Sequence, residues 1–307
     1  MKSVVFATII AACSFVTSFG QTSDRQWLDL NYAGDDKEYH NLDIYLPELE
    51  QPSYKAVIVI YGSAWFGNNL KQAAFNALGA PLLDSGFAVI AINHRSSGDA
   101  PYPAQINDVK AAVRFIRANA EKYKIDASFI GITGYSSGGH LASLAGTTNS
   151  VNEFTVNQTS VDIEGVVGNY TSESSAVNAV VDWFGPIDMA LMDECKGPKD
   201  GQSPEAALIR GNPAENLDMI ALLNPITFID ETDPQFLVIH GAADNVVPHC
   251  QSELFAEALS AKGLLTDFVT VPDGQHGPIT FNESTFKKMT DFFLKEVEGH
   301  DITTKFY

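Results

Sequence analysis

A short glycine-rich segment in the middle of the chain constrains its fold more than any other feature. The segment at 134–140 (Gly-Tyr-Ser-Ser-Gly-Gly-His) follows an apolar run at 129–133 and precedes a helical pattern at 141–145. A strand that turns at once into a helix leaves no room for side chains two residues before and after the turn, so glycine is needed there. The serine between these glycines is raised above the sheet at a helix N-terminus, where backbone N–H groups can hold an oxyanion. The spacing therefore predicts a nucleophile.

Two adjacent serines compete for this position. Ser136 has Gly134 and Gly138 two residues to either side, whereas Ser137 has the bulky Tyr135 two residues before it. A glycine-rich surface loop would have a similar composition, but the strand before it and the helix after it favour the tight turn. Ser136 is the predicted nucleophile.

Strand-like and helix-like patterns alternate along the chain from residue 29 onward. Strands are expected at 42–45, 56–61, 87–92, 129–133, 180–184, 236–239 and 267–271, and helices at 72–83, 103–123, 253–262 and 286–297. This alternation predicts an α/β fold with a mostly parallel, doubly wound sheet flanked by helices. We interpret 147–178 and 195–224 as excursions over the sheet and expect no separate cap domain. The second excursion contains short helical patterns at 204–209 and 217–223.

A serine hydroxyl needs a histidine base, and the histidine needs a carboxylate that fixes its tautomer. In folds of this kind the chain order is Ser, then Asp or Glu, then His. Asp244 follows the strand at 236–239, and His276 lies in a glycine-bracketed loop after the last strand. An aspartate in such a turn could also simply cap a helix, but its order and place favour catalysis. The other six histidines fit less well, and His249, the one rival, follows Asp244 too closely to face it easily.

The negative charge that develops on a substrate oxygen requires two backbone donors. One is expected from the N–H of Ser137, and the other from Ser63 or Ala64 in the loop after the strand at 56–61. Trp65 in the same loop either lines the substrate pocket or packs the loop. Tyr135, beside the nucleophile, is a second candidate for substrate contact.

Together these segments resemble the α/β-hydrolase superfamily, most nearly its exported bacterial esterases of the feruloyl and acetyl-xylan esterase-like group, near the hormone-sensitive-lipase type. Further segments that carry the resemblance lie at 94–95, 101–108, 182–186, 224–226 and 248–252. The resemblance implies a serine carboxylesterase for acetyl or hydroxycinnamoyl esters on plant polysaccharide. It implies Ser136, Asp244 and His276 as the catalytic triad and a supporting, non-catalytic role for Asp108.

The chain departs from this family pattern in one place. Where such families usually carry His-Gly-Gly-Gly, this chain has Tyr-Gly-Ser-Ala at 61–64. Backbone donors survive a change of side chain, but the conformational freedom of two glycines does not. The departure bears on oxyanion geometry and on the room left for substrate.

The first twenty residues indicate a secretory signal peptide followed by one catalytic domain at 21–307. A basic start, an apolar stretch at 4–16 and a small-residue cleavage site near Gly20 support this interpretation. The protein is therefore expected to be secreted or periplasmic. The alternative is a lipoprotein anchored through Cys13. Removal of 1–20 leaves Cys195 and Cys250, which follow two predicted strands and are expected to form a disulfide if those strands are neighbours.

Charge and motifs limit the partners and cofactors. The formal net charge is −19, which disfavours nucleic acid and anionic membranes as partners. No segment after the leader is apolar enough to span a bilayer. Because the sequence has neither His-Glu-x-x-His nor a phosphate-binding or dinucleotide-binding loop, no metal or cofactor is expected. The oligomeric state stays open.

Two alternatives to an esterase stay open. One is another serine hydrolase, a peptidase or a lipase, although the chain is short for a gating domain and lacks a clear apolar lid. The other is a non-catalytic carbohydrate-binding protein on a hydrolase fold, which the altered oxyanion loop keeps in view.

Overall fold

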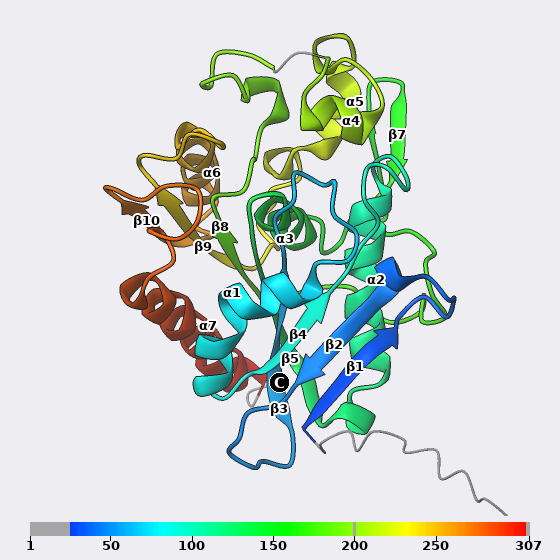
Figure 1. Cartoon of the computed structure of the whole chain (residues 1–307), viewed down its shortest axis with the longest axis vertical. Coiled ribbons are helices and arrows are strands. Elements are labelled where there is room, and N and C mark those ends of the chain that lie inside the picture. The colour runs from blue at the N-terminus through cyan, green and yellow to red at the C-terminus, as the bar shows by residue number, and fades with distance from the viewer. Residues whose placement is uncertain (1–24, 199–200, 305–307) are drawn as a thin grey trace, which may run out of the picture.

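An eight-stranded sheet forms the centre of the protein (Figure 1). The computed structural model describes residues 25–198 and 201–304. In spatial order the strands are β1 (Gln26–Asn31), β2 (Asn41–Tyr45), β4 (Ala88–Ile92), β3 (Tyr54–Ile60), β5 (Ile125–Tyr135), β8 (Ala179–Trp183), β9 (Gln235–Gly241) and β10 (Leu265–Val271). The pairs β1–β2 and β2–β4 are antiparallel and all others in this sheet are parallel. The predicted mostly parallel sheet is confirmed, and it places the carboxyl ends of β3, β5, β8, β9 and β10 at one edge.

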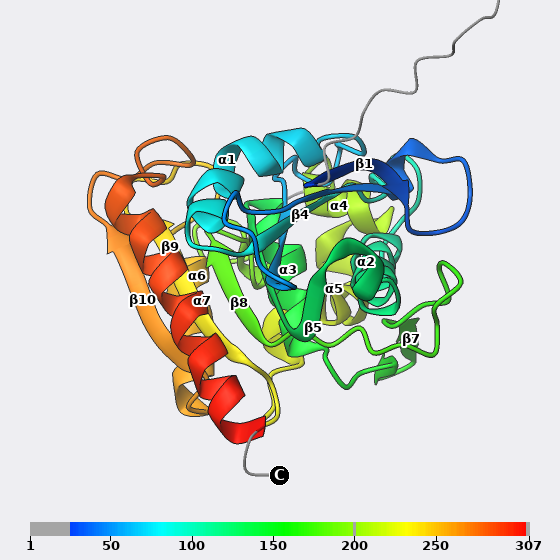
Figure 2. The ribbon, with the colours of Figure 1, turned by 90° about the horizontal axis from the view of Figure 1, so that it is seen from below.

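Helices cover both faces of the sheet (Figure 2). Helices α1 (Lys71–Asp84) and α7 (Glu283–Thr304) pack on one face, and α2 (Ala104–Ala118), α3 (Ser137–Thr147) and α6 (Cys250–Ala261) pack on the other. Alternate residues of a strand point to opposite faces, so in β3 Ile58 enters one core and Val57 and Val59 enter the other. Strands buried on both faces explain the continuous apolar runs in the sequence.

The predicted helix at 103–123 is wrong at its C-terminal end. Helix α2 ends at Ala118, where the side-chain amide of Asn119 donates to the carbonyl of Phe115 at 2.8 Å. A short 3-10 turn, η2 (Glu121–Tyr123), follows, and Lys124 adopts a left-handed φ of 54°. These features turn the chain back into β5. The apolar periodicity of the sequence continues past Ala118, which is why the predicted helix is too long.

Three further strands were not predicted. The edge strand β1 begins before the first expected strand, and β6 (Glu153–Val156) pairs with β7 (Thr159–Asp162) as a hairpin inside the excursion at 147–178. Both β1 and the hairpin are largely exposed. Little apolar alternation is needed in such strands, which is why the sequence pattern was weak.

After β8 the chain leaves the sheet, and the part that carries its short helices lies at the top of Figure 1. It contains the two predicted short helices, α4 (Pro204–Ile209) and α5 (Leu217–Leu223). Within the described residues, the other 3-10 turns are η1 (Glu38–His40), η3 (Met189–Leu191), η4 (Pro213–Glu215) and η5 (Pro225–Thr227). We refer to residues 185–198 and 201–224 as the outer segment.

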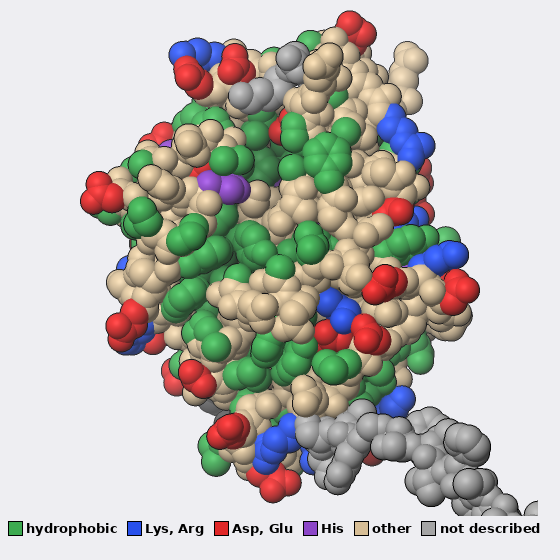
Figure 3. Space-filling view, viewed as in Figure 1, with side chains coloured by type: hydrophobic (Ala, Val, Ile, Leu, Met, Phe, Trp, Pro, Cys, Tyr) green, Lys and Arg blue, Asp and Glu red, His purple; other side chains and the backbone are tan. Residues whose placement is uncertain are grey.

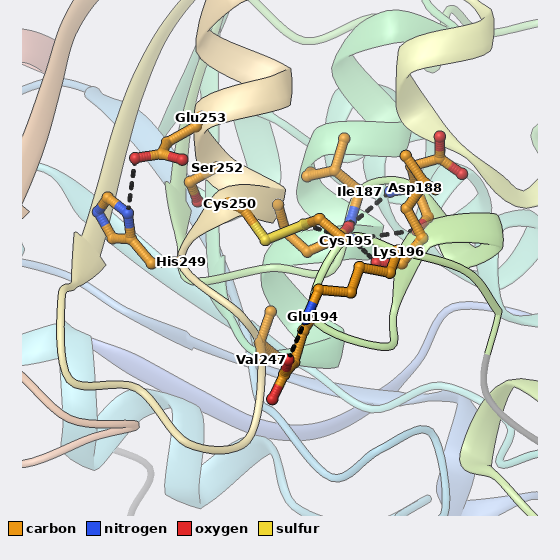
Figure 4. Close-up of a disulfide and its surroundings, with 12 residues drawn as sticks. Ile187, Asp188, Glu194, Cys195, Lys196, Val247, His249, Cys250, Ser252 and Glu253 are labelled. Carbon is orange, nitrogen blue, oxygen red and sulfur yellow. Dashed lines mark hydrogen bonds and ion pairs between the residues drawn. A yellow bond between two sulfur atoms is a disulfide. The ribbon is translucent and has the colours of Figure 1, made fainter.

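A disulfide between Cys195 and Cys250 attaches the outer segment to the start of α6 (Figure 4). Next to it, the side-chain amide of Gln251 donates to the carbonyls of Asp188 and Leu191 at 3.2 and 3.0 Å. The expected pairing of the two cysteines is thus present in the structure. The leader at 1–20 and its Cys13 lie outside the described residues. Over 25–198 and 201–304, no helix combines the length and apolar character that a bilayer crossing requires.

Candidate active site

Ser136 occupies a tight turn between β5 and α3. Its backbone has φ 57° and ψ −128°, a strained conformation for a residue with a side chain. A Cβ atom on Gly134 would lie 2.3 Å from the carbonyl oxygen of Gly138, and one on Gly138 would lie 2.4 Å from that of Ile60. The Ser136 amide donates to the carbonyl of Trp183 on β8 at 2.9 Å. The neighbouring strands therefore hold the serine above the sheet, as the glycine spacing predicts.

The structure brings Ser136 together with His276 and Asp244. The hydroxyl oxygen of Ser136 lies 2.9 Å from Nε2 of His276, and Nδ1 of His276 lies 2.7 Å from Oδ2 of Asp244. Because Nδ1 faces a carboxylate, it is the nitrogen that carries the proton, which leaves Nε2 free to accept one from the serine. The three side chains come from the carboxyl ends of β5, β9 and β10 and have the geometry that nucleophilic catalysis requires.

The carboxylate of Asp244 is fully buried but well supplied with donors. Its Oδ1 accepts hydrogen bonds from the amides of Val246 at 2.8 Å and Val247 at 3.0 Å. Its Oδ2 lies 3.3 Å from Nε2 of His240. Burial alone would raise the pKa of Asp244, but hydrogen bonds from His240, His276 and the backbone outweigh it and hold the pKa well below its usual range. Asp244 thus stays ionised and can stabilise a protonated His276.

The loop after β3 narrows the choice of oxyanion donors. The amide of Ser63 donates to the side-chain oxygen of Ser137 at 2.8 Å. Within the described residues, no hydrogen bond engages the amides of Ala64 and Ser137. Ala64 and Trp65 have φ of 49° and 60°, which glycine adopts without strain and other residues do not. The backbone bend that glycines usually allow is thus made here by side-chain-bearing residues, and it leaves Ala64 and Ser137 as the available pair.

Ser136 borders two cavities, which share Ala64 and Val246 in their walls. The larger has a volume of about 760 Å³ and the smaller about 280 Å³. Tyr135 and His276 line the smaller cavity, together with Phe184 and Phe281. On the face drawn in Figure 3, hydrophobic side chains gather around a histidine below the outer segment. The site therefore has room on both sides of the serine.

Trp65 both lines the substrate cavity and packs the loop after β3, the two roles that the sequence left open. It borders the larger cavity, yet it is only 2% exposed and its indole N–H donates to Nδ1 of His140 at 3.2 Å. The Nε2 of His140 donates to the carbonyl of Leu223 at 2.8 Å. Burial lowers the pKa of His140 to about 4, so the ring is neutral near neutral pH. His140 is a core histidine that joins α3 to the outer segment.

Asp108 has the supporting position that the resemblance implies. Its carboxylate accepts a hydrogen bond from the amide of Arg95 at 2.8 Å and pairs with the guanidinium of the same residue. This contact ties the chain after β4 to α2, and Asp108 is fully buried away from Ser136's two cavities.

Much of the wall of the larger cavity was missed by sequence reasoning. Met192, Ser203 and Glu205 line it, and all three come from the outer segment. No motif marks these positions; the only signal is that Glu205 falls in a predicted helix. Among residues 25–198 and 201–304, no cluster of three or more histidine, cysteine or acidic side chains is arranged to hold a metal ion.

Comparison with protein families identifies the chain. The BD-FAE family profile matches residues 42–259. The chain belongs to the BD-FAE family. Similar solved structures include a bifunctional GH43-CE protein of Bacteroides eggerthii, at 67% identity and a TM-score of 0.89, covering 90% of this chain and 36% of the other. A truncated carbohydrate esterase from gut microbiota is 55% identical, with a TM-score of 0.87, over 90% of this chain and 98% of the other.

More distant curated relatives of this BD-FAE chain include two mycobacterial proteins. Esterase LipQ of Mycobacterium tuberculosis is 28% identical over 82% of the chain, and the probable carboxylic ester hydrolase LipM of the same organism is 30% identical over 75%. The alignments cover 57% and 51% of those proteins, so the chain spans about half the length of the curated relatives it matches. The expected α/β-hydrolase fold and membership among esterase relatives are confirmed.

Proposed function

We propose that this protein is a serine carboxylesterase that hydrolyses short-acyl or hydroxycinnamoyl esters carried by plant polysaccharide. The observation that carries the proposal is the chain of contacts from Ser136 through His276 to Asp244, 2.9 and 2.7 Å long, beside a cavity open to substrate. The names of the similar proteins, which include esterases and a carbohydrate esterase, support the reaction class.

The geometry supports an acyl-enzyme mechanism. The Ser136 oxygen attacks the ester carbonyl carbon while Nε2 of His276 takes the hydroxyl proton. The amides of Ala64 and Ser137 stabilise the oxyanion, and the tetrahedral intermediate collapses as His276 gives its proton to the leaving alcohol oxygen. Water, deprotonated by His276, then attacks the acyl-enzyme and the acid departs with Ser136 reprotonated.

A fluorophosphonate probe and a panel of esters test this proposal. The wild-type protein should be labelled at Ser136, and Ser136→Ala should lose both label and turnover, the latter by roughly 10⁶-fold. Acetylated and feruloylated xylan should release acetate or ferulate. Folded wild-type protein that stays unlabelled would favour the non-catalytic binder, and faster turnover of long-chain esters or of peptide amides would favour a lipase or a peptidase.

We also propose export of the protein, guided by the leader at 1–20. The disulfide between Cys195 and Cys250 supports this proposal because such bonds persist in oxidising compartments. Detection of the mature protein outside the cytoplasm, with an N-terminus near residue 21, is the expected result. A lipid on Cys13 would indicate the anchored form instead.

A further inference from the structure

A second histidine contacts the carboxylate of Asp244. His240 lies near the end of β9 and is fully buried. Its Nε2 atom lies 3.3 Å from Oδ2 of Asp244 and 3.1 Å from the carbonyl oxygen of Val247. Its Nδ1 atom lies 2.7 Å from the hydroxyl oxygen of Ser252 on α6. The steps proposed above use His276 alone as the base, so they leave His240 without a role.

The partners of His240 indicate where its ring carries the proton. A carbonyl oxygen and an ionised carboxylate can only accept hydrogen bonds, so Nε2 carries the proton and faces both of them. The hydroxyl of Ser252 can then donate to Nδ1. A neutral ring protonated at Nε2 therefore satisfies all three contacts, and His240 meets Asp244 as an oriented donor.

His240 joins the turn that carries Asp244 to the sheet. This turn lies between β9 and α6. The donors to Oδ1 of Asp244, the amides of Val246 and Val247, belong to the same turn and would move with it. His240 instead stands on β9 and contacts the turn at two points, the carboxylate of Asp244 and the carbonyl of Val247. This arrangement directs the carboxylate at Nδ1 of His276.

The contact with His240 also favours the ionised form of Asp244. Burial raises the pKa of Asp244, and the hydrogen bond from His240 is the largest of the contributions that lower it. The ionised form is the one that stabilises a protonated His276. His240 is absent from the walls of both cavities beside Ser136, so bound substrate does not meet it. Any influence of His240 on the reaction passes through Asp244.

We propose that His240 is a positioning residue for the hydrolytic reaction: its Nε2–H holds the carboxylate of Asp244 against His276, and Ser252 orients the ring. This inference rests on the proposed function. A weaker contact between Asp244 and His276 slows every step in which His276 accepts or gives a proton. The loss should therefore appear equally in kcat and in kcat/KM.

The test compares two replacements of His240 on a short p-nitrophenyl ester. His240→Leu removes the donor and should lower kcat roughly 10- to 100-fold with KM unchanged. His240→Gln keeps an N–H near the place of Nε2 and should recover most of the lost rate. In His240→Leu the acidic limb of the kcat/KM profile should also shift to lower pH, because a weaker contact with Asp244 stabilises protonated His276 less. A purely structural defect would lower the active fraction and leave this limb in place.

Ser252→Ala tests the same contact from the other side of the ring. The variant removes the hydroxyl that orients His240 and should lower kcat roughly five- to tenfold, the effect of one lost hydrogen bond. In the His240→Leu background the same substitution should have no further effect. His249→Gln is the matched control and should keep the wild-type kcat and pH profile. The ring of His249 lies 5.2 Å from that of His240 between centroids, but its ion pair is with Glu253 (Figure 4).

Three results would overturn the proposal and leave the esterase standing, provided that a fluorophosphonate labels Ser136 of the wild type. The first is a wild-type kcat in His240→Leu that is folded as judged by thermal unfolding. The second is a folded His240→Gln as slow as His240→Leu, because the N–H would then not be what matters. The third is an acidic limb that stays in place or moves to higher pH. If His240→Leu does not fold, Ser252→Ala decides, and a wild-type kcat in that variant ends the proposal. Wild-type protein without labelling and turnover would instead refute the proposed function itself.

Discussion

The catalytic centre and the outer segment border the same cavity but are held in place by different means. Ser136, Asp244 and His276 follow β5, β9 and β10, so the central sheet and its hydrogen bonds fix their positions. In its described residues the outer segment has only short helices; a disulfide and the side chain of Gln251 attach it to α6, and Leu208, Leu222 and Leu223 anchor it in the core on one face of the sheet. The sheet thus positions the proposed chemistry, while a tethered excursion shapes the space for substrate. Changes in the two regions should have separable effects.

The largest predicted effect tests the catalytic centre alone. Asp244→Asn should lower kcat by roughly 10³- to 10⁴-fold, because an amide favours the wrong tautomer of His276 and cannot stabilise its protonated form. The preference among acyl groups should persist in the residual activity, since the larger cavity is untouched. Asp273→Asn, an exposed aspartate near His276, is the control and should be nearly silent. Steady-state kinetics of both variants check this, and an intact kcat in Asp244→Asn would remove Asp244 from the triad.

The next prediction tests the attachment of the outer segment. Replacing Cys195 and Cys250 together by serine should destabilise the protein by up to about 4 kcal/mol, the chain-entropy value for a separation of 55 residues. Urea unfolding measures this loss. Under native conditions, labelling of Ser136 by a small fluorophosphonate should slow less than turnover of bulky aryl esters. Equal losses in both would mean that the disulfide also supports the catalytic centre.

A third prediction concerns the residue that joins the two regions. His140 accepts a hydrogen bond from Trp65 and donates one to Leu223 of the outer segment, an arrangement that suits only the neutral ring. Its pKa falls from 6.5 to about 4 through burial. Because the pKa of His140 is lower in the folded than in the unfolded protein, its contribution to the free energy of unfolding is fully present above pH 6.5. That stability is lost as the pH falls toward 4, by about 3 kcal/mol.

Unfolding free energies measured between pH 7 and 4 check this expectation. Asp182 has the opposite effect on stability. Burial raises its pKa to about 7, so its protonation favours the folded state as the pH falls. The difference between wild type and His140→Gln isolates the histidine: the variant should be less stable at pH 7 and should lose less stability on acidification. Parallel curves for the two proteins would contradict the assignment.

The sequence predicted the structure correctly where a local physical requirement allows only one kind of residue at a position. Gly134 and Gly138 are required by backbone contacts below 2.5 Å, and the continuous apolar runs are required by strands buried on both faces. The prediction failed where the place of a residue in the fold depends on contacts with residues distant in the sequence or on a single side-chain hydrogen bond. Nothing near Glu205 in the sequence shows that an excursion folds it back to a cavity beside Ser136. The end of α2 at Ala118 was likewise set by a side-chain contact of Asn119, not by periodicity.

The loop after β3 was predicted only in part, and a substitution next to it has the smallest of the predicted effects. The sequence showed that two glycines were replaced, but not that the Ser137 hydroxyl would hold the Ser63 amide at 2.8 Å. Ser137→Ala should remove that one hydrogen bond, worth about 1 kcal/mol, and lower kcat roughly fivefold with KM unchanged, because the bond positions the amide of Ala64. Kinetics on a short p-nitrophenyl ester measure this. A fall above roughly 100-fold would show instead that the hydroxyl itself contacts the reacting oxygen.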